Sequence, residues 1–316
     1  PSQKSYVFGT FKDINIGKFG FGSQVVVMPY KNSSNVDLYF SGLKAHITYN
    51  SNPTITLGFH RTFLSGDFSI FYEETNFQGK WSIEDAARLV IEPLFGQSKR
   101  SLDYTIPNTP GFDRWDEVLT GYAKLYFPDD NLELYIDIAS DDSRGNFVDL
   151  KAHWDHTLGY LIGIKKFYSY KKWKFFFGAE YLTTRVSNTL KKEFYRGNPN
   201  QTNYYSYIGY DYFSYKGRRM GAHSGTSSDD LIFKMGLGNQ SKISFISYNK
   251  ERHGIKNAIL FPELKSEYCI SFQQKLSSYH TISITLEYEK IDNYGFISDN
   301  ISESKIIWFG YAFSLR

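Results

Sequence analysis

The sequence lacks any apolar run long enough to form a membrane-spanning helix. No stretch of about eighteen apolar residues occurs in the chain, and such a length is the minimum for a helix to cross a bilayer. The net charge is only +3 and is spread along the chain, which excludes the basic surface of a nucleic-acid-binding protein. Its one cysteine, Cys269, excludes an internal disulfide framework, and we expect it to be a packed thiol within a strand.

Signals of processing and of catalysis are also missing. The sequence begins at Pro1 with neither Met nor a signal peptide, so we expect a processed protein or a fragment. There is no Gly-x-Ser-x-Gly motif and no persuasive spacing of a nucleophile and its base, so we predict no enzymatic activity. We likewise predict no cofactor and no catalytic residue.

Aromatic residues are unusually frequent. The chain has 26 Tyr, 27 Phe and 5 Trp, together 18% of its residues, with 25 Gly and only 9 Pro. Aromatic side chains fit the pleated surface of a sheet, so this composition favours strands.

The segment 281–289 has one apolar and one polar side. Ile282, Ile284, Leu286 and Tyr288 alternate with Thr, Ser and Glu residues. Successive side chains of a strand point to opposite faces, so this segment forms a strand with two chemically different faces. The pattern is typical of a soluble sheet and also of a wall between lipid and water.

Short and long connections alternate strictly between about eleven such segments. The short ones are at 50–53, 128–131, 168–172, 238–240 and 277–280, and the long ones are at 64–116, 140–156, 185–227, 250–262 and 291–304. Outer-membrane barrels have short periplasmic turns and long extracellular loops, and a soluble up-and-down sheet has no reason to sort its connections. We therefore predict a single all-β domain over 1–316, a transmembrane antiparallel barrel of the bacterial outer membrane with about 12 or more strands.

Three local features depart from regular alternation. Residues 4–28 suggest two weak strands, and the apolar phase slips near Gly42, which predicts a β-bulge. Ser82 begins a capping box before Ala86–Ile91, which predicts one short helix in an extracellular loop, ended by Pro93.

The last segment supports insertion into the outer membrane. Gly310, Phe313 and Leu315 follow the pattern by which barrel-assembly machinery recognises final strands, although Arg316 departs from the usual aromatic end. With this end in the periplasm, the long connections are extracellular.

Several segments, taken in order, resemble the Wzi family of capsule-assembly outer-membrane proteins. They include Leu57-Gly58-Phe59-His60-Arg61-Thr62, Leu134-Tyr135-Ile136-Asp137 with Ser140-Asp141-Asp142, Gly178-Ala179-Glu180-Tyr181-Leu182-Thr183-Thr184-Arg185, and Tyr215 to Gly225 followed by Asp229-Asp230. Together they cover residues 36–238. Near the start, Gly17-Lys18-Phe19-Gly20-Phe21-Gly22 lacks the tryptophans of the family's segment. Family members are longer and carry an N-terminal plug, so we expect the first strands and the plug to be missing here or to lie on another chain.

The resemblance implies a surface lectin that anchors capsular polysaccharide, and the connection 185–227 has suitable chemistry. Aromatic faces stack on sugar rings, and cationic side chains bind the carboxylates of acidic capsules. We predict that polysaccharide binds to Tyr195, Arg196, Tyr204, Tyr205, Tyr207, Tyr210, Tyr212, Lys216, Arg218, Arg219 and His223. The alternative is that these tyrosines pack the loops or form the upper aromatic girdle.

Polar residues within the strands should face the barrel lumen, where they line a pore or contact a plug. These are Glu133, Asp137, Lys174, Glu180, Glu287 and Glu289. The segment His153-Trp154-Asp155-His156 has two potential metal ligands, but a solvated loop explains it better, so we predict no metal site.

Two other functions remain open at this point: a passive, porin-like channel, and a structural subunit of a larger envelope complex. The predicted partners are capsular or other surface polysaccharide, outer-membrane lipid and lipopolysaccharide, and an envelope protein; nucleic acid is excluded.

Overall fold

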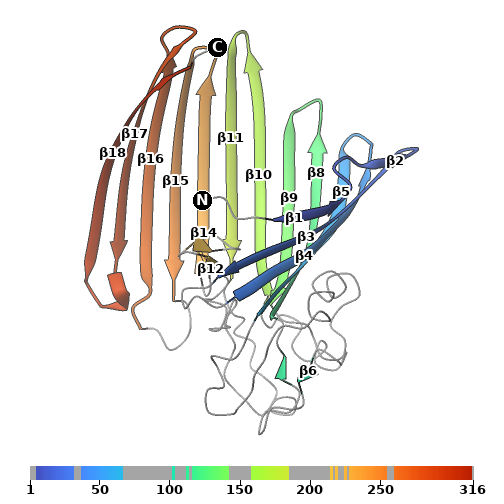
Figure 1. Ribbon diagram of the computed structural model, residues 1–316. Coiled ribbons are helices and arrows are strands. Elements are labelled where there is room, and N and C mark those ends of the chain that lie inside the picture. Colours follow the sequence, from blue (N-terminus) through green and yellow to red (C-terminus); the bar gives the residue numbers. More distant parts are fainter. Residues whose placement is uncertain are drawn as a thin grey trace.

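A computed structural model of the protein describes residues 5–31, 37–66, 102–103, 112–113, 116–141, 158–184, 214–215, 218–219, 224–225, 228–254 and 260–314. One antiparallel sheet of 14 strands dominates this part of the chain (Figure 1). Its strands are β1 (Tyr6–Gly9), β2 (Ile14–Ile16), β3 (Phe19–Lys31), β4 (Asp37–Tyr49), β5 (Thr54–Gly66), β8 (Asp116–Phe127), β9 (Leu132–Asp141), β10 (Leu158–Tyr170), β11 (Trp173–Thr183), β14 (Ser228–Gly238), β15 (Lys242–His253), β16 (Glu263–Lys275), β17 (His280–Asp292) and β18 (Ile301–Phe313).

Each long strand pairs with its neighbour in sequence, in the order of an up-and-down barrel. Two small hairpins lie outside the sheet, β6 (Leu102–Asp103) with β7 (Phe112–Asp113) and β12 (Ser214–Tyr215) with β13 (Arg218–Arg219). The prediction of an all-β antiparallel sheet with about 12 or more strands is confirmed. Among the described residues, no helix has the length and apolarity needed to cross a membrane.

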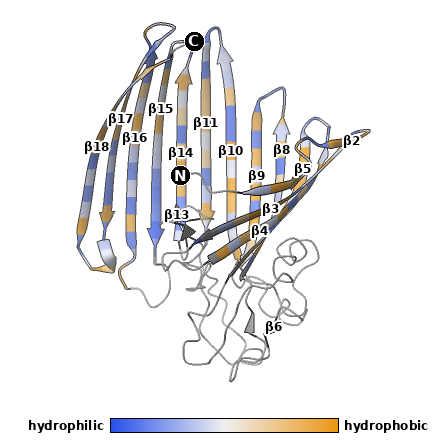
Figure 2. Cartoon of the chain, in the orientation of Figure 1, coloured by the Kyte–Doolittle hydropathy of each residue, from blue (hydrophilic) through white to orange (hydrophobic). Residues whose placement is uncertain are grey.

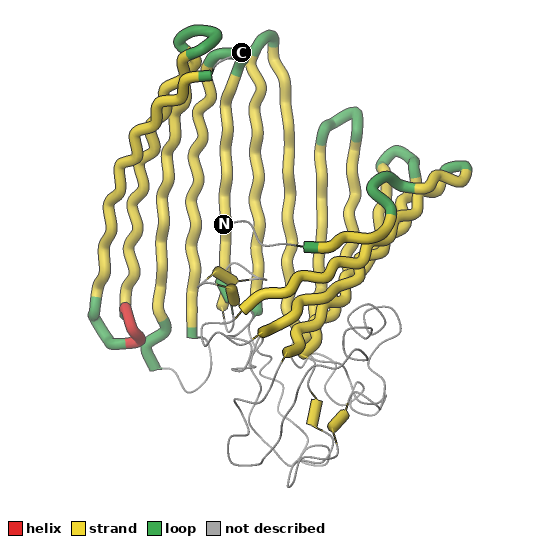
Figure 3. The backbone as a smooth tube through the Cα atoms, viewed as in Figure 1, coloured by secondary structure: helices red, strands yellow, loops and turns green. Residues whose placement is uncertain are grey.

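The two ends of the sheet differ in their connections. The turn end, where residues 50–53, 128–131, 171–172, 239–241 and 276–279 join the strands, is uppermost in Figure 3. All the long connections join the strands at the opposite end, here called the loop end. The shortest turn places Lys171 in the left-handed region, at φ 53°. The sorting predicted from the sequence is therefore observed.

The sheet has a polar face and an apolar face, and Figure 2 shows the alternation along the strands. In β17 the polar face carries Thr285, Glu287 and Glu289, and the apolar face carries Ile284 and Leu286. Residues that pair directly in an antiparallel ladder share a face, so these faces can be followed across the whole sheet. Ile284 lies opposite Phe272 and Phe309 on the apolar face.

The predicted bulge near Gly42 is wrong. β4 pairs with β3 and β5 in an uninterrupted register from Leu38 to Tyr49. The change of phase in the sequence comes instead from apolar side chains that lie on the polar face near the loop end. Leu38, Leu64 and Val118 lie on that face and are 2%, 0% and 7% exposed. A switch in environment and a switch in register therefore leave the same pattern in the sequence.

The N-terminal region forms three strands and not the two predicted. β1 and β2 both pair with β3, on the edge opposite β4, so they act as one interrupted edge strand. Thr10 holds the interruption against β3, since its backbone N–H donates to the Ser23 carbonyl at 2.8 Å and its hydroxyl accepts from the Ser23 N–H at 2.9 Å.

The sheet is open within the described residues. Its pairing runs from β1 to β18, and no pair joins β18 to β1, β2 or β3. In Figure 1 the sheet curves so strongly that β3 and β4 run obliquely to β14–β18. The predicted helix at Ala86–Ile91 lies outside the described residues.

Candidate functional site

The six polar residues predicted to line the lumen all lie on the polar face. Gly163 of β10 pairs with both Tyr135 and Glu180, and Lys165 pairs with Glu133. Followed strand by strand, the register puts all six on the same face, although on strands that are far apart: Glu133, Asp137, Lys174, Glu180, Glu287 and Glu289. That this face borders a lumen stays a prediction.

Side chains of β8–β11 form a polar network on this face. The Glu133 carboxylate lies 3.5 Å from the ammonium groups of both Lys124 and Lys165. The Tyr135 hydroxyl donates to Glu180, and the Lys165 ammonium lies 4.4 Å from the centre of the Tyr135 ring. These ion pairs are partly exposed, so each contributes little stability.

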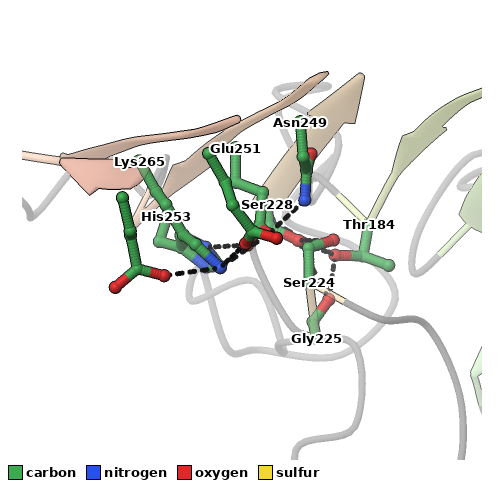
Figure 4. Close-up of polar contacts among 10 residues, drawn as sticks. Thr184, Ser224, Gly225, Ser228, Asn249, Glu251, His253 and Lys265 are labelled. Carbon is green, nitrogen blue, oxygen red and sulfur yellow. Dashed lines mark hydrogen bonds and ion pairs between the residues drawn. The ribbon is translucent and has the colours of Figure 1, made fainter. Parts of the chain in front are cut away.

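Lys265 is the centre of a second cluster, near the loop end of β15–β17 (Figure 4). Its ammonium nitrogen lies 3.0 Å from Glu267, 3.2 Å from Glu289 and 3.4 Å from Glu251. Its side chain is 19% exposed, so these contacts are screened less than those of a surface lysine. One cation thus joins carboxylates from three adjacent strands.

Glu251 links this cluster to its surroundings. Its side chain is 4% exposed, accepts a hydrogen bond from the Asn249 amide at 2.6 Å and lies 2.7 Å from His253 Nε2. The cluster holds three carboxylates against one ammonium. Among the described residues, no group of His, Cys, Asp and Glu is arranged to hold a metal ion.

Hydroxyl groups join the two ends of the connection between β11 and β14. The Thr184 N–H donates to the Ser228 carbonyl at 2.9 Å, and the Thr184 hydroxyl donates to the Gly225 carbonyl. The Ser228 hydroxyl donates to Ser224 at 2.8 Å, and Thr184, Ser224 and Ser228 are all at most 2% exposed. These four residues, here called the neck, adjoin the Lys265 cluster through the pairing of Ser228 with His253 (Figure 4).

Most residues predicted to bind polysaccharide lie outside the described part of the chain. The exceptions are Arg218 and Arg219, which form β13, although the structure describes only their backbone. The sequence His153-Trp154-Asp155-His156 also lies outside it.

The Lys265 cluster and the neck were not predicted from the sequence. The sequence does contain a signal for the cluster, because ionisable residues recur at every second position and so share one face of a strand. On β15 these are Glu251 and His253, and on β16 they are Glu263, Lys265 and Glu267. The contact between the strands depended on a register that only the fold reveals.

Comparison with known proteins identifies the class of fold. No protein-family model matches the sequence, and no curated protein sequence matches it. The solved structure of Wzi, an outer-membrane protein involved in group 1 capsule assembly in Escherichia coli and described as a carbohydrate-binding β-barrel, matches with a TM-score of 0.58 at 13% identity. The match covers 93% of this chain and 56% of Wzi, so the chain spans little more than half the length of that protein.

A second solved structure, OmpT of Vibrio cholerae, covers 99% of this chain and 81% of its own at 8% identity, but its TM-score of 0.35 carries no weight. Similarity to Wzi at 13% identity shows a shared fold and nothing finer. The protein therefore has the fold of an outer-membrane β-barrel.

Proposed function

We propose that the protein is a non-enzymatic, Wzi-like outer-membrane barrel that binds or anchors capsular or other surface polysaccharide. The observation that carries this proposal is that all the long connections join the sheet at one end. The most Tyr- and Arg-rich of them, 185–227, leaves the sheet through the buried neck. The fold shared with a carbohydrate-binding barrel supports the same conclusion.

The orientation follows from the proposed location. The loop end is extracellular, the turn end is periplasmic, the apolar face meets lipid and the polar face lines the lumen. Unpaired polar groups are costly in lipid, so the face with Glu133, Glu180 and Glu287 must be the one turned away from it.

The neck supports binding because it holds Thr184 and Ser228, which flank the connection, next to each other. Hydrogen bonds among Thr184, Gly225 and Ser228 restrain both ends of the 185–227 segment at one point. Tyrosines on such a loop can stack on sugar rings while Arg218 and Arg219 bind acidic groups.

Affinity for the polysaccharide extracted from the surface of the producing cells tests the proposal. The protein in detergent should bind it, and Arg218→Ala with Arg219→Ala should weaken binding at least about tenfold, since each charged hydrogen bond contributes about 1.5–3 kcal/mol. Lys171→Ala with Lys172→Ala, two charges at the turn end, should leave binding unchanged. Equal binding by both double variants would contradict the loop assignment.

A passive channel is the second candidate, favoured by the charged side chains of the polar face. It predicts ion conductance when the protein is inserted into a planar bilayer. A structural role in an envelope complex is the third, and predicts a stable partner that co-purifies with the barrel.

A further inference from the structure

The apolar face of β14–β18 changes character in rows from the turn end to the loop end. One row is aliphatic, with Ile246, Ile270, Leu286 and Ile307 opposite one another in register and 52%, 51%, 44% and 73% exposed. These side chains have the exposure and chemistry of a surface that contacts lipid acyl chains.

The next row toward the loop end consists of tyrosines. Tyr248, Tyr268 and Tyr288 pair across β15–β17, with ring centres 4.9 Å and 6.3 Å apart. Lys305 continues the row on β18, and its ammonium lies 5.7 Å from the Tyr288 ring. Tyrosines prefer the level of the lipid headgroups, because there the apolar ring can contact lipid while the hydroxyl is hydrated.

Beyond the tyrosines the face becomes charged. Lys250 and Arg252 are the next two outward residues of β15, both are exposed, and the loop end of β15 is hydrophilic in Figure 2. Lys290 and Asp292 lie at the same levels on β17 and pair with each other at 2.8 Å. Asp229, opposite Arg252, accepts a hydrogen bond from the Tyr181 hydroxyl at 3.2 Å, and Glu303 lies opposite Lys290.

Lys250 and Arg252 differ from the other charges of this rim. Within the described part of the chain, neither forms an ion pair with a carboxylate. They therefore leave two cationic groups directly above a tyrosine row and an aliphatic row. This sequence of layers matches an anionic lipid, with its phosphate level with the cations and its chains along the isoleucines.

We propose that Lys250 and Arg252 bind the phosphate of a phosphorylated lipid in the membrane leaflet on the loop side, while its acyl chains lie on Ile246 and Ile270. The site rests on the orientation proposed above, but it does not depend on polysaccharide binding. It lies on the apolar face of the sheet, whereas Ser228 of the neck, which is next to Asp229 in the register beside Arg252, lies on the polar face.

Lipid retention by the purified protein tests the proposal. Native mass spectrometry in detergent should show that the protein retains bis-phosphorylated lipid A about tenfold more than the enzymatically dephosphorylated form. Lys250→Gln with Arg252→Gln should remove this preference, because each cation near a membrane surface strengthens binding to anionic lipid severalfold. Lys242→Gln is the matched control, since Lys242 lies on the same face of the same strand at the turn end.

The exchange variant Lys250→Arg with Arg252→Lys keeps both charges and should retain the lipid, which separates loss of binding from loss of folding. Equal retention by the Gln double variant and the native protein would overturn the site, as would an equal loss in Lys242→Gln. Full displacement of the lipid by inorganic phosphate at the same concentration would show a free-phosphate site and would also overturn the proposal. Polysaccharide binding should be unchanged in the Gln double variant, so failure of this proposal and failure of the proposed function are distinguishable.

Discussion

Ile284 and Ser283 are neighbours in β17 that lie on opposite faces of the sheet. Ile284 is 39% exposed between Phe272 and Phe309, whereas Ser283 lies on the polar face opposite Gly310. If the apolar face meets lipid, Ile284→Lys should destabilise the protein by about 2–4 kcal/mol, because a lysine near the middle of the membrane loses its hydration. Urea unfolding in lipid vesicles measures this cost.

Ser283→Lys is the control for this substitution. Its ammonium would enter the polar side of the sheet, so a change well below that of Ile284→Lys is expected. Equal stability of the two variants would show that the faces are assigned wrongly.

Gly163 provides the space in which the Tyr135 ring lies. A Cβ atom at Gly163 would overlap that ring, and Tyr135 must keep its position to donate to Glu180. Gly163→Ala should therefore cost about 1–3 kcal/mol, the usual range for overpacking. The same holds at two other glycines: a Cβ atom at Gly58 would overlap the Tyr122 ring, and one at Gly22 would overlap the His46 ring.

The matched control is Gly121→Ala, because a Cβ there would have no atom of the described residues within 4 Å and the backbone is not left-handed. Its free energy of unfolding should change by less than about 0.5 kcal/mol, as is usual for surface substitutions. Adding Tyr135→Ala to Gly163→Ala should recover part of the loss. A Gly163→Ala variant as stable as Gly121→Ala would contradict the packing.

Among the strand elements, β15, β16 and β17 are joined near the loop end by Lys265. Lys265→Gln leaves Glu251, Glu267 and Glu289 close together without their shared cation. We expect a loss of about 1–3 kcal/mol, below the cost of breaking a fully buried pair because the lysine is partly exposed. Urea unfolding is the suitable measurement, since urea does not screen charge.

Lys275→Gln serves as the control within the same element. Lys275 lies on the same face of β16, at the turn end, and forms no ion pair among the described residues. A loss in Lys275→Gln equal to that in Lys265→Gln would show that the cluster has no special role.

Local sequence predicted the strands well because each carries its own alternation. Residues 281–289 need no distant partner to show two faces. The phase change in β4 predicted a bulge that is absent, because apolar Leu38 of β4 is buried on the polar face, as is Leu64 of β5, and burial depends on the assembled sheet. Lys265 and its carboxylates were missed for the same reason, since Glu251 and Glu289 reach it from neighbouring strands.

At the scale of the whole molecule, the open edge of β18 limits how the sheet can be placed in a membrane. Within the described residues, β18 is 13 residues long and is paired on one side only, and unpaired N–H and C=O groups cannot be left in contact with lipid. In the outer membrane we therefore expect further strands, from the same protein or a partner, to cover this edge. Hydrogen exchange of the protein in its native membrane should then be as slow in β18 as in β17.

Exchange in 301–313 much faster than in 280–292 would contradict coverage of the edge. The β16 segment 263–275, which is paired on both sides, provides the reference rate for a fully covered strand.

The sequence by itself determined the strands, their two faces and the sorting of short and long connections, because these properties depend on the order of residues along one strand and its neighbours. Only the tertiary structure decided the register that gathers Lys265 with three carboxylates, the hydroxyl contacts that form the neck, and the placing of Lys250 and Arg252 above a row of tyrosines. Each of these joins residues from different strands, and their distances are set by pairing and curvature of the whole sheet.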